Sequence, residues 1–246
     1  MAKFKSFCYG FLMVNLLWWL LALSMSRPIV PAPLAVYANL GRVFREHGMV
    51  LHIGHSMWRL FSSLFISLLL GLILGLAMAR SKFWDKVLDP FIYFTYPIPK
   101  ISLLPVVMVL FGLGDLSKVT MIVMIVVFQV IINVRDGVRA IPNESYQILH
   151  CLGAPKWRLF TKITFPAALA SIISSLRVAL GTGLSILFFI ENYGTRLGVG
   201  YYILNAWSRM NWVDMYSGIV VLSGLGFAFF LLLDLIEAHF LKWRES

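Results

Sequence analysis

Residues 60–79 read Leu60-Phe-Ser-Ser-Leu-Phe-Ile-Ser-Leu-Leu-Leu-Gly-Leu-Ile-Leu-Gly-Leu-Ala-Met-Ala79 and are closed by Arg80-Ser-Lys82. A run of about 20 apolar residues is long enough to cross a bilayer as a helix. Small residues recur in it at every fourth position, namely Ser63, Ser67, Gly71, Gly75 and Ala79. This spacing places them on one face, where a second helix can approach closely. The pattern therefore favours a packing seam over a ligand site.

The composition extends this prediction to the whole chain. Of its 246 residues, 60% are hydrophobic, 15% aromatic and only 13% charged, and the mean hydropathy is +0.84. Soluble domains are about 45–50% apolar and about 25% charged, so an ordinary soluble enzyme and a disordered chain are both excluded. The predicted fold class is all-α integral membrane, with about six transmembrane helices of about 20 residues each.

Hydrophobic runs and polar interruptions place the elements. Transmembrane helices are expected at 7–25, 60–79, 90–111, 119–134, 167–190 and 216–240. The first run could instead be a signal peptide because Lys3 and Lys5 precede it, but its length and the poor cleavage site after it favour a retained span. Apolar residues at helical spacing predict an amphipathic interfacial helix at 34–46.

Repeated prolines single out the third predicted span. Pro97, Pro99 and Pro105 interrupt it, and proline removes backbone hydrogen bonds that need other partners in a membrane. An irregular span buried in the bundle is expected.

Lysine and arginine set the expected orientation. The net charge is +10, which in an apolar chain reflects basic cytoplasmic loops more often than nucleic acid binding. Six spans put twelve Lys and Arg on the side of the termini and seven on the other, which predicts that both termini are cytoplasmic. We expect one transmembrane domain over 1–246, with an N-terminal span and outer helix at 1–58, a core at 59–246, and a cytoplasmic loop at 135–166.

The loop at 135–166 carries a recognisable pattern. Glu144-Ser-Tyr-Gln-Ile-Leu-His-Cys-Leu-Gly153 is followed by Ala154-Pro-Lys-Trp-Arg-Leu-Phe-Thr-Lys-Ile163-Thr-Phe-Pro166. It resembles the Glu-Ala-Ala loop of binding-protein-dependent ABC importer permeases, in which Gly, Ile and Pro stand at these offsets. Gln147, Ile148 and Leu149 replace Glu-Ala-Ala, and Phe165 replaces a Leu. The loop thus departs from the family pattern at its start.

Further motifs follow in the order typical of the nitrate/sulfonate/taurine branch of that family. They are Leu88-Asp-Pro90, Ile98-Pro99, Leu104-Pro105, Phe111-Gly-Leu-Gly-Asp115-Leu-Ser-Lys118, Asn133 and Leu176-Arg-Val-Ala-Leu-Gly181. The resemblance implies a type I ABC importer permease that moves a sulfonate-, nitrate- or taurine-like anion, or a related small molecule, into the cytoplasm by alternating access.

The resemblance also implies partners. These are a second copy of the chain, two ABC ATPase subunits, an extracytoplasmic substrate-binding protein and the bilayer of a bacterial cytoplasmic (inner) membrane. No Gly-x-x-x-x-Gly-Lys-Ser/Thr occurs in the chain, so ATP and Mg are expected on the ATPase subunit and no cofactor on this one. Residues implied in the ATPase-coupling loop are Glu144, Gln147, Gly153, Ala154, Ile163 and Pro166. The alternative is a cytoplasmic loop without a partner.

Polar residues inside the spans are candidates for the substrate pathway, because such groups usually face a protein interior or a water-filled path. The candidates lie on one face of each of two spans and are Gln129, Asn133, Arg177, Ser185, Phe188 and Asn192. The alternative is hydrogen bonding between helices. Arg177 could attract an anion or serve a structural or gating role. Asp234 and Glu237 are expected to reach the interface or to pair with a cation.

The segment 191–214 carries Tyr201, Tyr202, Trp207 and Trp212, and such aromatic residues are typical of an outer membrane interface. Contact with a docked binding protein is the alternative there. For the whole chain the competing hypothesis is a self-sufficient secondary transporter or channel, but no half-to-half repeat supports it. No catalytic constellation and no metal-ligand spacing is found, and Cys8 and Cys151 are isolated.

Overall fold

The computed structural model describes the backbone of residues 2–25 and 29–240 and the side chains of 9–25 and 29–238. All regular elements in this part are helical. The chain divides into two compact units, one from residues 1–56 and 191–225 (unit 1) and one from 57–190 and 226–246 (unit 2). Lys3, Lys5, Cys8, Arg27, Lys242 and Arg244, which entered the charge and cysteine arguments, lie outside the described side chains.

Among the described residues, four helices are long and apolar enough to cross a membrane: Met49–Arg80, Asp115–Arg139, Lys156–Ile190 and Trp212–Ala238. A bent pair, Lys82–Thr95 and Lys100–Phe111, raises the number to five if it counts as one span. The all-α membrane fold is thus confirmed. The first predicted span, 7–25, corresponds to α1 (Ala2–Ser24), whose described side chains belong to a shorter apolar helix, Tyr9–Ser24.

Close packing of α3 (Met49–Arg80) on α6 (Asp115–Arg139) forms the core of unit 2. A Cβ on Gly71 would lie 2.5 Å from Val130 Cγ1, and one on Gly75 would lie 2.8 Å from Val134 Cβ. Ser63 is fully buried, and its hydroxyl donates to the Arg59 carbonyl oxygen. The predicted packing seam of small residues is therefore confirmed, because a larger residue at either glycine would force the two helices apart.

The third predicted span is broken, as its prolines indicated. Helix α4 (Lys82–Thr95) contains Pro90, and a short 3-10 turn (Lys100–Leu103) leads into α5 (Leu104–Phe111). The two parts are bent by 82°. Lys100 Nζ donates to the carbonyl oxygens of Thr95 at 2.9 Å and Tyr96 at 3.2 Å, which supplies partners to groups freed at the break.

The expected burial of this span is wrong for the single chain. Tyr93 and Phe94 are each 74% exposed and Val109 is 85% exposed. The reason is that α4 and α5 contact the rest of unit 2 along one side only. Their opposite side is apolar and faces outward.

The limits of the fourth and fifth predicted spans need small corrections. Helix α6 begins at Asp115 and ends at Arg139, several residues beyond each predicted limit. Helix α9 (Phe165–Ile190) continues without a break from α8 (Lys156–Leu159) through one π-helical turn (Phe160–Thr164). Pro166 therefore lies inside a helix of 35 residues rather than ahead of its start.

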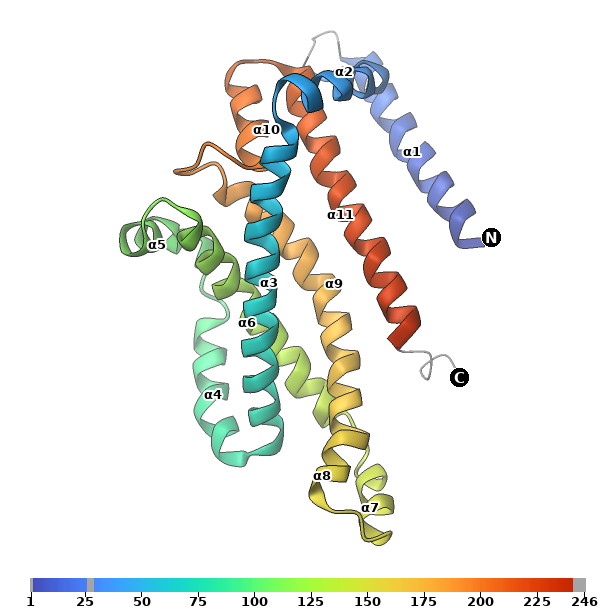
Figure 1. The fold of residues 1–246 in the computed structure, drawn as a ribbon, viewed down its shortest axis with the longest axis vertical. Coiled ribbons are helices and arrows are strands. Elements are labelled where there is room, and N and C mark those ends of the chain that lie inside the picture. Colours follow the sequence, from blue (N-terminus) through green and yellow to red (C-terminus); the bar gives the residue numbers. More distant parts are fainter. Residues whose placement is uncertain (1, 26–28, 241–246) are drawn as a thin grey trace. The chain divides into compact units, whose positions relative to one another are not determined.

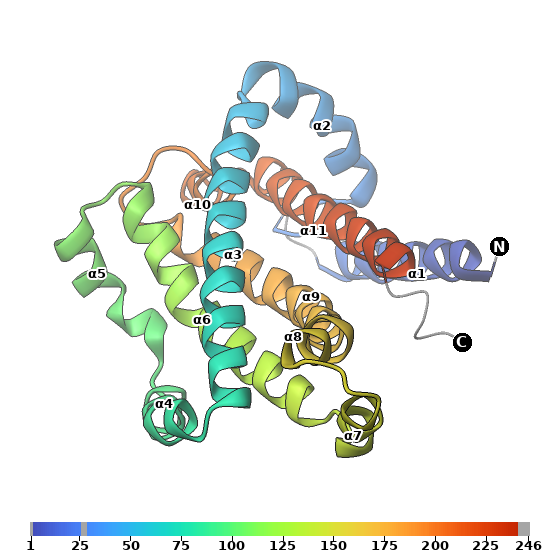
Figure 2. The ribbon, with the colours of Figure 1, turned by 60° about the horizontal axis from the view of Figure 1, so that its bottom comes forward.

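Helix α6 crosses α9 within unit 2, and at one end both reach α7 (Asn143–Cys151) and α8 (Figure 1 and Figure 2). The groups at this end are tied together: Arg139 Nη2 lies 2.6 Å from Asp85 Oδ1, and the Arg80 guanidinium lies 5.1 Å above the Phe160 ring. The loop at 135–166 thus has a firm base on α3 and α4.

Unit 1 contains α1, α2 (Pro33–Glu46), α10 (Val199–Ser208) and the first part of α11 (Trp212–Phe240). The predicted helix at 34–46 is α2, with Pro33 at its first turn as helix starts favour. Trp18 stacks on Tyr216 with ring centroids 5.5 Å apart. Helix α10 was not predicted separately from the segment 191–214.

We predict that Gly71→Ala destabilises the protein by about 1–3 kcal/mol, because its new methyl group overlaps Val130 in a packed core. Thermal unfolding of the purified protein in detergent measures this. Gly54→Ala on the same helix is the matched control, since a Cβ there meets nothing within 4 Å. Equal unfolding temperatures of both variants would contradict the packing seam.

Candidate functional site

The loop at 135–166, which we call the coupling loop after the role that the resemblance implies, is a helical hairpin with an exposed tip. Helix α7 ends in a Schellman motif, in which Gly153 N donates to the His150 carbonyl oxygen and Ala154 N to that of Leu149, both at 3.0 Å. Gly153 has φ +71°, a left-handed conformation that glycine adopts without strain. Pro155 then precedes the first turn of α8. A helix, a sharp glycine turn and a second helix thus make up the loop.

The surface of this hairpin is apolar at its tip. Ile148, Leu152 and Trp157 are 64%, 76% and 70% exposed. Glu144 and Gln147 are also exposed on α7. A patch of large exposed apolar side chains on a polar loop is the mark of an interaction surface.

The rest of the hairpin packs against its own base. The Tyr146 hydroxyl and Thr164 Oγ1 lie 3.1 Å apart and join α7 to the π-helical turn. Ala154, Ile163 and Pro166 are half-buried. The structure thus brings the six predicted coupling-loop residues into one hairpin, with the first half of the pattern facing outward.

A groove with several polar residues in its lining lies between α6 and α9 beside the hairpin. It has a volume of about 610 Å³, and its lining includes Asn133 and Asp136 from α6 and Ser171, Ser174 and Ser175 from α9. The two helices approach closely here, since a Cβ on Gly137 would lie 1.8 Å from Ser171 Oγ. The hydroxyls of Ser171 and Ser175 donate to carbonyl oxygens one turn earlier, which leaves their lone pairs available to the groove.

The predicted pathway residues do not all meet in this groove. Asn133 lines it, whereas Gln129 lies one turn away with its Oε1 buried and without a hydrogen-bond partner among the described residues. Ser185 is exposed and donates to the Gly181 carbonyl oxygen, and Phe188 is half-buried. Asn192 belongs to unit 1.

Arg177 lies outside the lining of the groove. Its Nη2 contacts Asp234 Oδ1 at 2.5 Å and Glu237 Oε2 at 2.8 Å, both on α11. The cation expected as a partner for these carboxylates is therefore Arg177 itself. As placed here, its charge is engaged by two anions.

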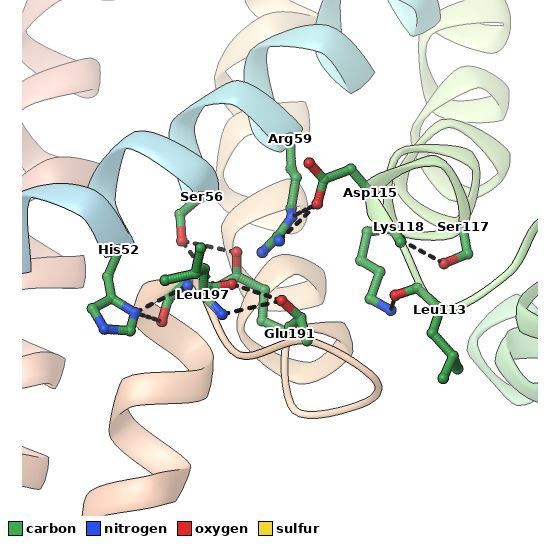
Figure 3. Close-up of polar contacts among 12 residues, drawn as sticks. His52, Ser56, Arg59, Leu113, Asp115, Ser117, Lys118, Glu191 and Leu197 are labelled. Atoms are coloured by element: carbon green, nitrogen blue, oxygen red, sulfur yellow. Dashed lines mark hydrogen bonds and ion pairs between the residues drawn. The ribbon is translucent and has the colours of Figure 1, made fainter.

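Two polar clusters were missed by the sequence analysis. In unit 1, Glu191 is fully buried and accepts hydrogen bonds from Ser56 Oγ at 2.8 and 2.9 Å and from Gly200 N at 2.9 Å (Figure 3). In unit 2, the start of α6 is held by Arg59, which bonds Asp115 at 2.7 Å, and by Lys118 Nζ, which donates to the Leu113 carbonyl oxygen at 2.7 Å (Figure 3). The sequence shows only that these charged residues lie beside apolar spans. That position does not indicate which residues they contact in the fold.

A third cluster in unit 1 surrounds Asp214 at the start of α11. Its carboxylate accepts from Asn39 Nδ2 at 2.8 Å and from Asn211 Nδ2 at 2.6 Å. His47 Nδ1 lies 3.1 Å from the Tyr202 hydroxyl. Burial, followed by the Asp214 charge, raises the pKa of Tyr202, so its hydroxyl stays protonated. This cluster fastens α2 to α11 and α10.

The chain is similar to known proteins in both sequence and fold. Residues 67–243 match the family described as binding-protein-dependent transport system inner membrane component. The taurine transport system permease protein TauC of Escherichia coli (strain K12) is 27% identical over 234 residues, which cover 92% of this chain and 85% of TauC.

Two solved transporters share the fold. An inward-facing structure of the MetNI methionine ABC transporter has a TM-score of 0.68 at 19% identity and covers 78% of this chain and 95% of its own. A bacterial alginate ABC transporter, in complex with an alginate-bound periplasmic protein, has a TM-score of 0.67 at 16% identity and covers 96% of this chain and 95% of its own.

We predict that Arg177→Ala lowers the unfolding temperature by about 2–4 °C, the shift for about 1 kcal/mol from a half-exposed ion pair in a chain of this size. Two carboxylates then lose their cation. Adding Asp234→Asn and Glu237→Gln should restore most of the lost stability. Thermal unfolding of the single and triple variants measures this recovery. A triple variant less stable than Arg177→Ala would show that the lost ion pairs are not the source of the lower unfolding temperature.

Proposed function

The chain belongs to the binding-protein-dependent transport system inner membrane component family, and on this premise we propose that it is the membrane-spanning subunit of an ATP-driven importer. It carries the solute path and no ATP site. The observation that carries this proposal is the coupling loop, an exposed hairpin with an apolar tip on a firmly held base.

The hairpin has the form needed to receive force from a partner. Ile148, Leu152 and Trp157 offer a large apolar contact, and such anchors dominate the energy of protein interfaces. We propose that an ABC ATPase subunit, with ATP and Mg, docks there through Glu144, Gln147, Gly153 and the neighbouring turn. Closure of two ATPase subunits then drives alternating access.

The complete importer contains two copies of this chain, two ATPase subunits and an extracytoplasmic substrate-binding protein. The apolar outer side of α4 and α5 supports a membrane or subunit contact, since Tyr93, Phe94 and Val109 are exposed in the single chain. We place the complex in a bacterial cytoplasmic membrane with both termini of the chain in the cytoplasm.

The proposed solute is a small sulfonate-, taurine- or nitrate-like anion. The similarity to TauC over most of the chain supports this class. The groove with Asn133 and the three serines of α9 offers hydroxyl and amide groups that can replace water around a polar solute. We assign Gln129, Ser185, Phe188 and Asn192 to the same path, and Arg177 to holding α9 on α11.

The first experiment is purification of the tagged protein from its native host in mild detergent, followed by mass spectrometry of the proteins that remain bound. Recovery of a P-loop ATPase is the expected result. The purified complex is then reconstituted with taurine and nitrate as test solutes. Active uptake by this chain alone, driven by an ion gradient, would refute the proposal in favour of a secondary transporter.

We predict that Gly153→Val abolishes recovery of the ATPase while the protein still inserts in the membrane. A β-branched residue is disfavoured at φ +71°, so the turn that presents the hairpin tip is lost. Gly153→Asn is the matched control, because asparagine tolerates this conformation. The amount of ATPase recovered per permease measures the effect, and equal recovery with both variants would contradict the docking site.

A further inference from the structure

The first backbone N–H groups of α10 are satisfied by side chains from distant parts of the sequence. Gly198 N donates to His52 Nδ1 at 3.1 Å, Val199 N to Ser56 Oγ at 2.8 Å, and Gly200 N to Glu191 Oε2 at 2.9 Å. His52 and Ser56 stand one turn apart on α3 (Figure 3). We call Glu191, Ser56, His52 and the backbone of 198–200 the Glu191 cluster.

The Glu191 carboxylate accepts hydrogen bonds through both of its oxygens. The Ser56 hydroxyl and the Gly200 N–H are the donors. Ser56 joins the carboxylate to the helix, since its oxygen accepts from Val199 N while its single hydrogen points to the carboxylate. The carboxylate therefore lies at the start of α10, where the helix dipole favours an acidic group.

Glu191 is also the residue directly after α9, which ends at Ile190. An anion at a helix C-terminus is unfavourable, and the carboxylate is instead turned to the next helix. It lies against the backbone of Gly198, where φ is +135° and an added Cβ would come within 2.4 Å of Glu191 Cδ. The loop 191–200 is thus closed on its own first residue and has no space for a side chain at 198.

From these contacts we propose that Glu191 is a positioning residue: its buried carboxylate, through Ser56 and the Gly200 N–H, holds the start of α10 on the first turns of α3. The inference rests on the proposed function, in which unit 1 has to keep its form while the importer takes up solute. A loop left open between 191 and 198 would leave the start of α10 free to shift.

The test uses the full importer, reconstituted in liposomes with its ATPase and binding protein, and measures solute taken up per ATP hydrolysed in each assembled complex. Glu191→Gln keeps the shape and removes the charge. We expect this ratio to fall about tenfold, a size consistent with the loss of a hydrogen bond to a charged group. Glu191→Asp, which keeps the charge, should recover part of the ratio.

Ser56→Ala tests the cluster from α3 and should lower the ratio in the same direction. The double variant should be no worse than the stronger single one, because the two groups act through one contact. Ser208→Ala is the matched control: its hydroxyl lies at the other end of α10, is exposed, and bonds only the Leu204 carbonyl oxygen in its own helix. It should match the wild type.

Three outcomes separate the possibilities. A wild-type ratio in assembled Glu191→Gln and Ser56→Ala complexes overturns the positioning role. Failure of both variants to assemble also overturns it, because the cluster would then serve folding alone. Absence of ATP-dependent uptake by the wild-type complex refutes the proposed function itself and is seen before any variant is measured.

Discussion

The requirement that every backbone N–H and C=O find a partner where water is scarce governs this chain. Straight helices meet it internally, but each break exposes groups that need other partners. At the proline break after α4, Lys100 reaches back five residues to Thr95. At the turn before α6, Lys118 reaches back five residues to Leu113. In both places a lysine stem covers apolar surface while its ammonium group satisfies helix-end carbonyls.

Several charged residues of the chain find their partners in one another, as ion pairs. Arg135 contacts Asp89 and Asp136, Arg139 contacts Asp85, and Arg59 contacts Asp115. An unpaired charge at membrane depth is costly, so residues that cross between helices also fix which helices are neighbours. Arg177 follows this rule: with Asp234 and Glu237 it fastens α9 to α11. Its position on a polar helix face indicated a pathway residue, whereas its partners indicate a structural cation.

Local features of the fold could be predicted because their causes lie close together in the sequence. Glycine and serine every fourth residue predicted the seam of α3, and three prolines predicted the broken span. The offsets of Gly153, Ile163 and Pro166 indicated the resemblance of the loop at 135–166 to the family pattern. The contacts of Glu191 could not be predicted in this way, since Ser56 is 135 residues away and only the folded chain brings the two together. The exposed side of α4 and α5 was missed because apolarity alone does not distinguish a buried helix from one that faces lipid or another subunit.

The coupling loop is joined to both walls of the groove, α6 and α9. This connection determines how a force on the loop would act within unit 2. One end continues from α6, which supplies Asn133 and Asp136, and the other end is the same unbroken helix that supplies Ser171, Ser174 and Ser175. Arg80 on Phe160 and Tyr146 on Thr164 hold the base, so the hairpin resists bending. The single π-helical turn at Phe160–Thr164 is the one irregularity in that long helix, and such turns adjust more easily than α-helix. Because Gly137 and Ser171 are already in close contact, a force on the hairpin tip would change the groove by sliding or rotating its two walls rather than by pressing them together.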